Sequence, residues 1–311
     1  MQLTWKASES ASSLYAATCL AAGHAVADRR LAEAFAPAVD FALAELAACG
    51  APAKRWLPML TGLAASGVEG NRQLADQTIT KLMGGGGPNA ALAGRVAGCV
   101  AELKAAFQSA YRETAPSADR PLVDELLLRG RPLVEQWEAR GPGMLWHVNR
   151  STEEGVLAER ADVVLVYPLV GGHGLAHLPV NAVTFEAVLA NPLDDLPEVA
   201  RLAWLVAQLN LDVPKFAEHL PAERLEGVAQ FAMVPPVLAA AEHVELGRFT
   251  PEAIERAIVA WRIVDAGTDN VAEIADVLSN WWTTYQEGST PWAVAVAALD
   301  QMLLGVSNDR S

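Results

Sequence analysis

The chain has 311 residues, of which 52% are hydrophobic and 19% charged, and its formal net charge is −14. This composition excludes intrinsic disorder, and the length favours about two domains. The acidic balance argues against binding to nucleic acid or to an anionic membrane, because both attract basic proteins. Cys19, Cys49 and Cys99 are far apart and form no CxxC pair. This pattern is typical of a reducing compartment, so we expect a cytoplasmic protein.

The first third of the sequence predicts an array of alanine-rich helices. The first is an amphipathic helix over residues 10–30. The alternative, a signal peptide, is disfavoured because the residues before it carry one lysine, Lys6, and one acid, Glu9, and so lack a positive n-region. Further helices are expected at residues 37–49, from Pro52, at 69–83 and at 88–114. The tetraglycine at 84–87 lacks the Lys-Ser or Lys-Thr ending of a phosphate-binding loop, so it predicts a hinge. No apolar run approaches the ~20 residues of a membrane span.

A further helix is predicted from Leu122, because leucines and Trp137 recur there at helical spacing. Gly130 and Pro132 should bend it. The sequence Gly141-Pro142-Gly143 predicts a turn that ends it.

The pattern then changes to β-structure. Residues 162–168 are rich in β-branched side chains, and residues 181–188 alternate apolar and polar side chains, so both predict strands. The segment 171–179 between them is rich in glycine and contains His173 and His177. We refer to this segment as the Gly/His segment, and it is the most unusual part of the chain.

The last third is again helical. Residues 199–211 predict a helix that is apolar nearly all round and therefore buried. Its Gln208 needs a partner, which we expect near Glu186 or His177. About four more helices are expected between Pro221 and Leu304.

These elements predict a mainly α fold (α+β), with a helical array and a helical unit that contains a small β-sheet. The polar segment 115–120 is the expected domain boundary. It separates an N-terminal helical domain (residues 1–116) from a mixed domain (residues 117–311) with strands near 162–188 and C-terminal helices.

The histidines of the Gly/His segment are candidate metal ligands. In an extended segment, His173 and His177 are roughly 13 Å apart at ~3.3 Å per residue, so a shared zinc requires a tight turn at Gly174. Glu186 on the following strand offers a carboxylate as ligand or catalytic base. The alternative is a hairpin loop whose histidines bond to backbone or water.

The order of strand, Gly-rich segment, strand and buried helix over residues 160–212 resembles the core of zincin-like metallopeptidases. In that family the helix carries H-E-x-x-H. In this chain Trp204 and Gln208 stand where the zinc histidines would be, and Leu205 stands where the general base would be. Tryptophan offers zinc no lone pair, and leucine takes no proton from water. The resemblance therefore implies a degenerate core without the zincin reaction.

Trp281 and Trp282 are the candidate interface residues. Adjacent residues on a helix point about 100° apart, so one of the two indoles can be exposed as an interface anchor. The alternative is that the indoles pack in a core or at a domain interface, with Trp292 close by in the sequence.

Three functions remain open. The first is a non-catalytic interaction or scaffold protein, in the form of a zincin-like pseudoenzyme that binds a protein partner or a second copy and needs no cofactor. The second is a metal-dependent hydrolase with zinc at His173 and His177. The third is a small-molecule binding protein with a pocket under residues 169–179.

Overall fold

The computed structural model describes the chain except for residues 85–88, 115–119, 189–192, 194, 265–266 and 309–311. The described part is mainly helical with a small mixed sheet, which confirms the predicted fold class. Most of the predicted tetraglycine hinge and of the predicted domain boundary lies outside the described residues. Among the helices of the described residues, none has both the length and the apolar character that crossing a membrane requires.

The elements follow one another in this order: β1 (Gln2–Ala7), α1 (Glu9–Ala21), α2 (Arg29–Ala47), α3 (Ala53–Ala65), α4 (Asn71–Met83), α5 (Ala90–Thr114), α6 (Leu122–Ser151), β2 (Arg160–Leu165), β3 (Gly174–His177), the 3-10 helix η1 (Leu178–Val180), β4 (Ala182–Phe185), α7 (Glu198–Ala207), α8 (Pro214–Ala217), α9 (Ala222–Ala232), α10 (Val234–His243), α11 (Pro251–Ala260), α12 (Val271–Glu287) and α13 (Trp292–Asn308).

The chain forms two compact units. Unit 1 comprises residues 1–2, 132–161 and 189–311, and unit 2 comprises residues 3–131 and 162–188. This grouping differs from the predicted division at residues 116 and 117, which assigned the strands to the C-terminal part. The strands belong with the N-terminal helices because α3 packs directly against β3 and β4.

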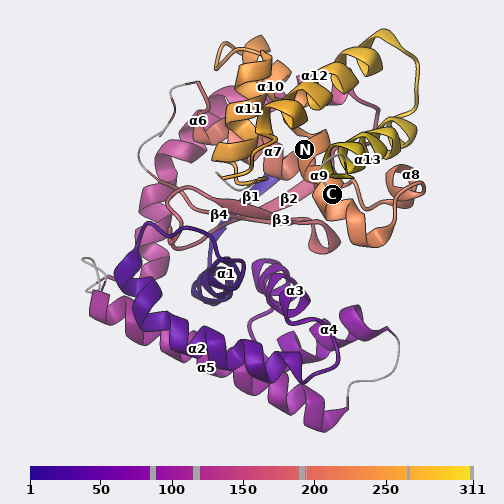
Figure 1. The fold of residues 1–311 in the computed structure, drawn as a ribbon. Coiled ribbons are helices and arrows are strands. Elements are labelled where there is room, and N and C mark those ends of the chain that lie inside the picture. Colours follow the sequence, from indigo (N-terminus) through magenta and orange to yellow (C-terminus); the bar gives the residue numbers. More distant parts are fainter. Residues whose placement is uncertain (85–88, 115–119, 189–192, 194, 265–266, 309–311) are drawn as a thin grey trace. The chain divides into compact units, whose positions relative to one another are not determined.

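Unit 2 is layered. Its sheet rests on α1 and α3, and α2 and α5 pack together in the next layer (Figure 1). Helix α1 is buried on every side between Ala11 and Cys19, as expected for a small-residue helix in the middle layer. The hydroxyls of Thr18 on α1 and Thr61 on α3 are 2.9 Å apart. This contact pairs two buried hydroxyls across the layer.

The sheet has the strand order β1-β2-β4-β3, with β4 parallel to β2 and antiparallel to β3. Both predicted strands are present as β2 and β4, although β4 is shorter than the expected 181–188. Strand β3 lies inside the Gly/His segment, which the sequence predicted as a linker. Strand β1 was not predicted at all, because its six residues are partly exposed and carry no β-branched run.

Helix α6 corrects the predicted turn at Gly141-Pro142-Gly143, because it continues to Ser151. Pro132 and Pro142 lie inside it, although an internal proline disfavours a helix by about 3 kcal/mol. Packing explains the neighbouring glycine. A Cβ on residue 141 would lie 2.4 Å from the ring of Trp137, so the buried indole packs closely over the helix backbone there.

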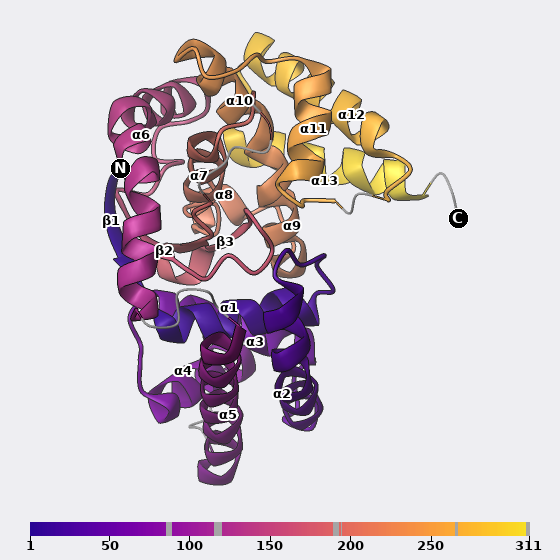
Figure 2. The same ribbon diagram turned by 90° about the vertical axis from the view of Figure 1, so that its left-hand side faces the viewer.

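Helix α7 lies in the interior of unit 1, where it packs against α10 (Figure 2). All ten of its residues are buried, which confirms the predicted buried helix, although it ends at Ala207 instead of residue 211. The pair Pro235-Pro236 lies in the first turn of α10, where missing N–H groups are tolerated. Thr250 caps α11 through its side chain, which accepts a hydrogen bond from the Ala253 N–H.

Candidate functional site

The Gly/His segment follows a tightly anchored turn in unit 2. The hydroxyl of Tyr167 donates to Asp28 Oδ2 at 2.6 Å, and the carbonyl of Leu169 accepts from the N–H groups of Ala27 and Asp28. Gly171 has a φ of 87°, and a Cβ there would lie 2.8 Å from the Cβ of Ala27. Glycine is therefore required at this position for both its backbone conformation and its close approach to the neighbouring segment.

Glu186, the candidate ligand or base, is fully buried just after β4. Its Oε1 accepts a hydrogen bond from the Val170 N–H at 2.8 Å. Its Oε2 accepts from the N–H groups of Gly172 at 2.7 Å and His173 at 3.0 Å. An ionised carboxylate is an acceptor only, and bonds of this charge-assisted kind are stronger than neutral ones. Glu186 thus stabilises, through these three hydrogen bonds, the turn that leads into β3.

His173 is 4% exposed and lies immediately before β3. Its ring packs edge-on against the ring of His24, with centroids 4.9 Å apart, and lies 6.2 Å from the ring of Tyr15. Its imidazole is thus packed towards α1 and the residues that follow it.

His177, at the end of β3, is also buried. Its Nε2 lies 3.1 Å from the hydroxyl of Thr184, and its ring packs against Gly62 on α3. Burial lowers its pKa to about 4, so the ring is neutral at pH 7.

The structure therefore joins Glu186 to His173 through the backbone of His173, whereas His177 packs against α3. Within the part of the chain that the structure describes, no three His, Cys, Asp or Glu side chains form a group that would hold a metal ion.

Helix α7 carries the three positions at which the zincin motif is degenerate. The indole Nε1 of Trp204 donates to the Gln230 carbonyl at 2.8 Å, and the Trp204 ring stacks on Trp261 with centroids 5.2 Å apart. Gln208 Nε2 donates to the carbonyl of Trp204 at 3.0 Å. This helical bond replaces the predicted contact with Glu186 or His177. Leu205 is buried in the same interior.

A buried ion pair on α7 was not predicted. Glu198 and Arg201 are 8% and 5% exposed, and Arg201 Nη2 lies 3.1 Å from Glu198 Oε1. Their spacing of three residues on a helix was the available signal, because such residues lie on one face. This signal was overlooked because the residues around the pair are apolar.

Trp281 and Trp282 are not exposed interface anchors, because each is only 4% exposed. They form a core cluster with Tyr285 and Trp292, and Trp281 Nε1 donates to the Ala295 carbonyl at 2.7 Å. The core alternative is therefore correct for both. Trp146, on α6, is instead 54% exposed.

Two surface cavities lie away from the predicted sites. One, in unit 2, adjoins the start of α1 and includes Lys104, and the other, in unit 1, adjoins the end of α6. Residues 169–179 line neither of them.

Comparison of the chain with known protein families, curated proteins and solved structures found no match.

Proposed function

We propose that this chain is a non-catalytic interaction or scaffold protein, with a zincin-like core that performs no metal chemistry. The observation that carries this proposal is the bonding of Glu186. Both of its oxygens accept hydrogen bonds from backbone N–H groups of the turn that leads into β3. A carboxylate occupied in this way is poorly suited to ligate zinc or to take a proton from water.

The side chains of α7 support the same conclusion. Trp204 and Gln208 donate their N–H groups to backbone carbonyls, and Leu205 has no polar side-chain atom. Each of the three is at most 2% exposed. Side chains of this kind contribute packing, and neither the indole of Trp204 nor the side chain of Leu205 offers a lone pair to a metal.

The partner that we propose is a protein or a second copy of the chain. Trp146 offers an exposed aromatic anchor, with the Arg150 guanidinium 5.3 Å above its ring, and tryptophan and arginine are enriched in interface hot spots. A cytoplasmic location belongs to the same proposal. It is supported by the buried thiols of Cys49 and Cys99, whose pKa values are raised by burial.

The experiment that tests the absence of metal chemistry is a measurement of metal content. Untagged protein, purified without chelator, is compared with a His173→Ala/His177→Ala double variant and with a control, His219→Ala, in which an exposed histidine is removed. We expect no stoichiometric metal in any of the three. Near-stoichiometric zinc that the double variant loses and the control retains would contradict the proposal.

The interaction itself is tested by reciprocal capture between the chain and a purified partner. Trp146→Ala is expected to weaken the association. Equal capture by the wild type and this variant would exclude Trp146 as the anchor.

A further inference from the structure

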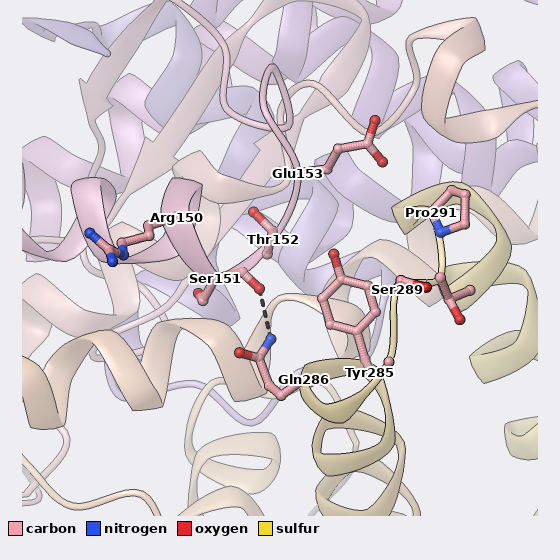
Figure 3. Close-up of a pocket in the computed structure, with 10 residues that line it drawn as sticks. Arg150, Ser151, Thr152, Glu153, Tyr285, Gln286, Ser289 and Pro291 are labelled. Carbon is pink, nitrogen blue, oxygen red and sulfur yellow. Dashed lines mark hydrogen bonds between the residues drawn. The ribbon is translucent and has the colours of Figure 1, made fainter.

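The cavity of unit 1 lies where the end of α6 meets the connection between α12 and α13. It is a surface cavity open to solvent, with a volume of about 470 Å³. Its polar lining residues include Arg150, Thr152, Glu153, Tyr285, Gln286 and Ser289. We call it the α6–α12 cavity (Figure 3).

Tyr285 is the most firmly positioned of these residues. Its ring stacks against Trp281 and Trp282, with centroids 6.2 and 5.7 Å away, and meets Trp292 edge-on at 5.2 Å. Figure 3 shows the phenol directed into the cavity, towards Thr152 and Glu153. Burial, together with the charge of Glu153, raises the pKa of Tyr285. The hydroxyl is therefore protonated at neutral pH and available as a donor or an acceptor.

The charged groups at the cavity already have partners in the chain. Glu153 Oε1 lies 2.7 Å from Lys215 Nζ, and its Oε2 accepts from the Trp292 N–H at 2.9 Å. These contacts lower the pKa of Glu153 and balance its charge. The guanidinium of Arg150 lies over Trp146 and is directed away from the cavity (Figure 3). The charge of Glu153 is therefore paired within the chain, and the charge of Arg150 is directed away from the cavity.

The uncharged groups provide both hydrogen-bond donors and acceptors. Gln286 Nε2 donates to the Ser151 carbonyl at 2.7 Å, which fixes the amide and leaves its oxygen as an acceptor. Ser289 and Thr290 add hydroxyls on the connection between α12 and α13. A hydroxyl-rich ligand matches such a lining, because each of its hydroxyls can both donate and accept.

We propose that the α6–α12 cavity binds a small uncharged molecule rich in hydroxyl groups, that is, a polyol or a saccharide. This site lies in unit 1 and is independent of Glu186 and of the histidines of unit 2. It therefore goes beyond the scaffold function and does not depend on it.

The test is a saturation-transfer NMR titration of the full chain with glycerol, myo-inositol, glucose, N-acetylglucosamine and maltose. We expect saturable binding of at least one of these probes. Tyr285→Phe keeps the ring stacking and removes one hydrogen bond, so it should weaken binding about fivefold. The matched control is Tyr111→Phe, which removes a buried phenol hydroxyl of unit 2 and should leave binding unchanged.

Thermal melting establishes that both variants are folded. The proposal is overturned if none of the probes binds saturably, or if Tyr285→Phe binds as well as the control does. Citrate and spermidine serve as charged probes of similar size. Tighter binding of either one than of every uncharged probe would also overturn it.

Discussion

The substitution Glu186→Gln separates a structural role of this carboxylate from a chemical one. The change preserves shape and volume but replaces one accepting oxygen by an NH₂ donor. With its remaining oxygen at the Oε2 position, the amide still accepts from Gly172 and His173. Its NH₂ group then faces the Val170 N–H, and two donors oppose each other in a buried site.

The size of the effect follows from these bonds. A buried donor left without its acceptor costs about 1–3 kcal/mol, and the two bonds that remain weaken because their acceptor is no longer charged. The sum is about 2–5 kcal/mol of unfolding free energy. At about 2–4 °C per kcal/mol for a domain of this size, Tm should fall by roughly 5–15 °C.

The assay is thermal unfolding by circular dichroism, together with hydrogen exchange at the amides of Val170, Gly172 and His173. The matched control is Glu33→Gln, at an exposed glutamate of α2 in the same unit. The exchange rates of these amides should be higher in Glu186→Gln than in the wild type, and the same in the control as in the wild type. If both variants have the melting temperature of the wild type and protect these amides equally, the structural role assigned to Glu186 is wrong.

Further predictions concern other buried groups. The pKa of His177 is about 4 in the folded chain, whereas its ordinary value is 6.5. Between pH 6.5 and pH 4, His177 is therefore protonated in the unfolded chain and neutral in the folded chain. The free energy of unfolding should therefore fall by about 3 kcal/mol as the pH drops through this window. In urea unfolding, His177→Gln should lack this pH-dependent loss. An equally steep pH dependence in that variant would contradict the buried, neutral state assigned to His177. Trp281→Ala should lower the unfolding free energy by about 3–5 kcal/mol, whereas the exposed Trp146→Ala should change it by less than about 1 kcal/mol, and similar melting of the two would refute the assigned burial. Gly171→Ala should destabilise by more than about 1 kcal/mol, because its Cβ meets Ala27 and its φ is positive, and a wild-type melting curve would exclude this strain.

The helices and two of the strands were predictable because their signals are local. Apolar spacing identified the buried α7, a run of β-branched residues identified β2, and alternating apolar and polar residues identified β4. Strand β3 was hidden because glycine and histidine have little intrinsic preference for strands. Its pairing with β4, from Gly174 opposite Phe185 to His177 opposite Ala182, arises from tertiary contacts.

The error at Gly141-Pro142-Gly143 has a similar origin. Local preference predicts a turn, whereas in the structure these residues are helical and the indole of Trp137 packs against the backbone of Gly141. The division into units was not predictable from linkers alone, because contacts between α3 and the sheet join segments about a hundred residues apart.

The sequence drew attention to the Gly/His segment, but it did not predict the contacts that the residues of this segment make. The sequence identified His173, His177 and Glu186 as its chemistry-bearing side chains. It gave no sign that the carboxylate of Glu186 faces the N–H groups of Val170 and Gly172, because hydrogen-bond partners 14 and 16 residues away depend on the turn geometry. Tyr285 was missed because its signal is a cavity, which forms only after folding.

The most direct test of the central claim is a search for peptidase activity. The untagged chain is incubated with zinc and a complex peptide library, and cleavage is read by mass spectrometry beside Glu186→Gln and Glu33→Gln. A non-catalytic protein yields no cleavage above that of the buffer in any of the three samples. Cleavage by the wild type and by Glu33→Gln that a chelator abolishes, and that a folded Glu186→Gln protein lacks, would contradict the account.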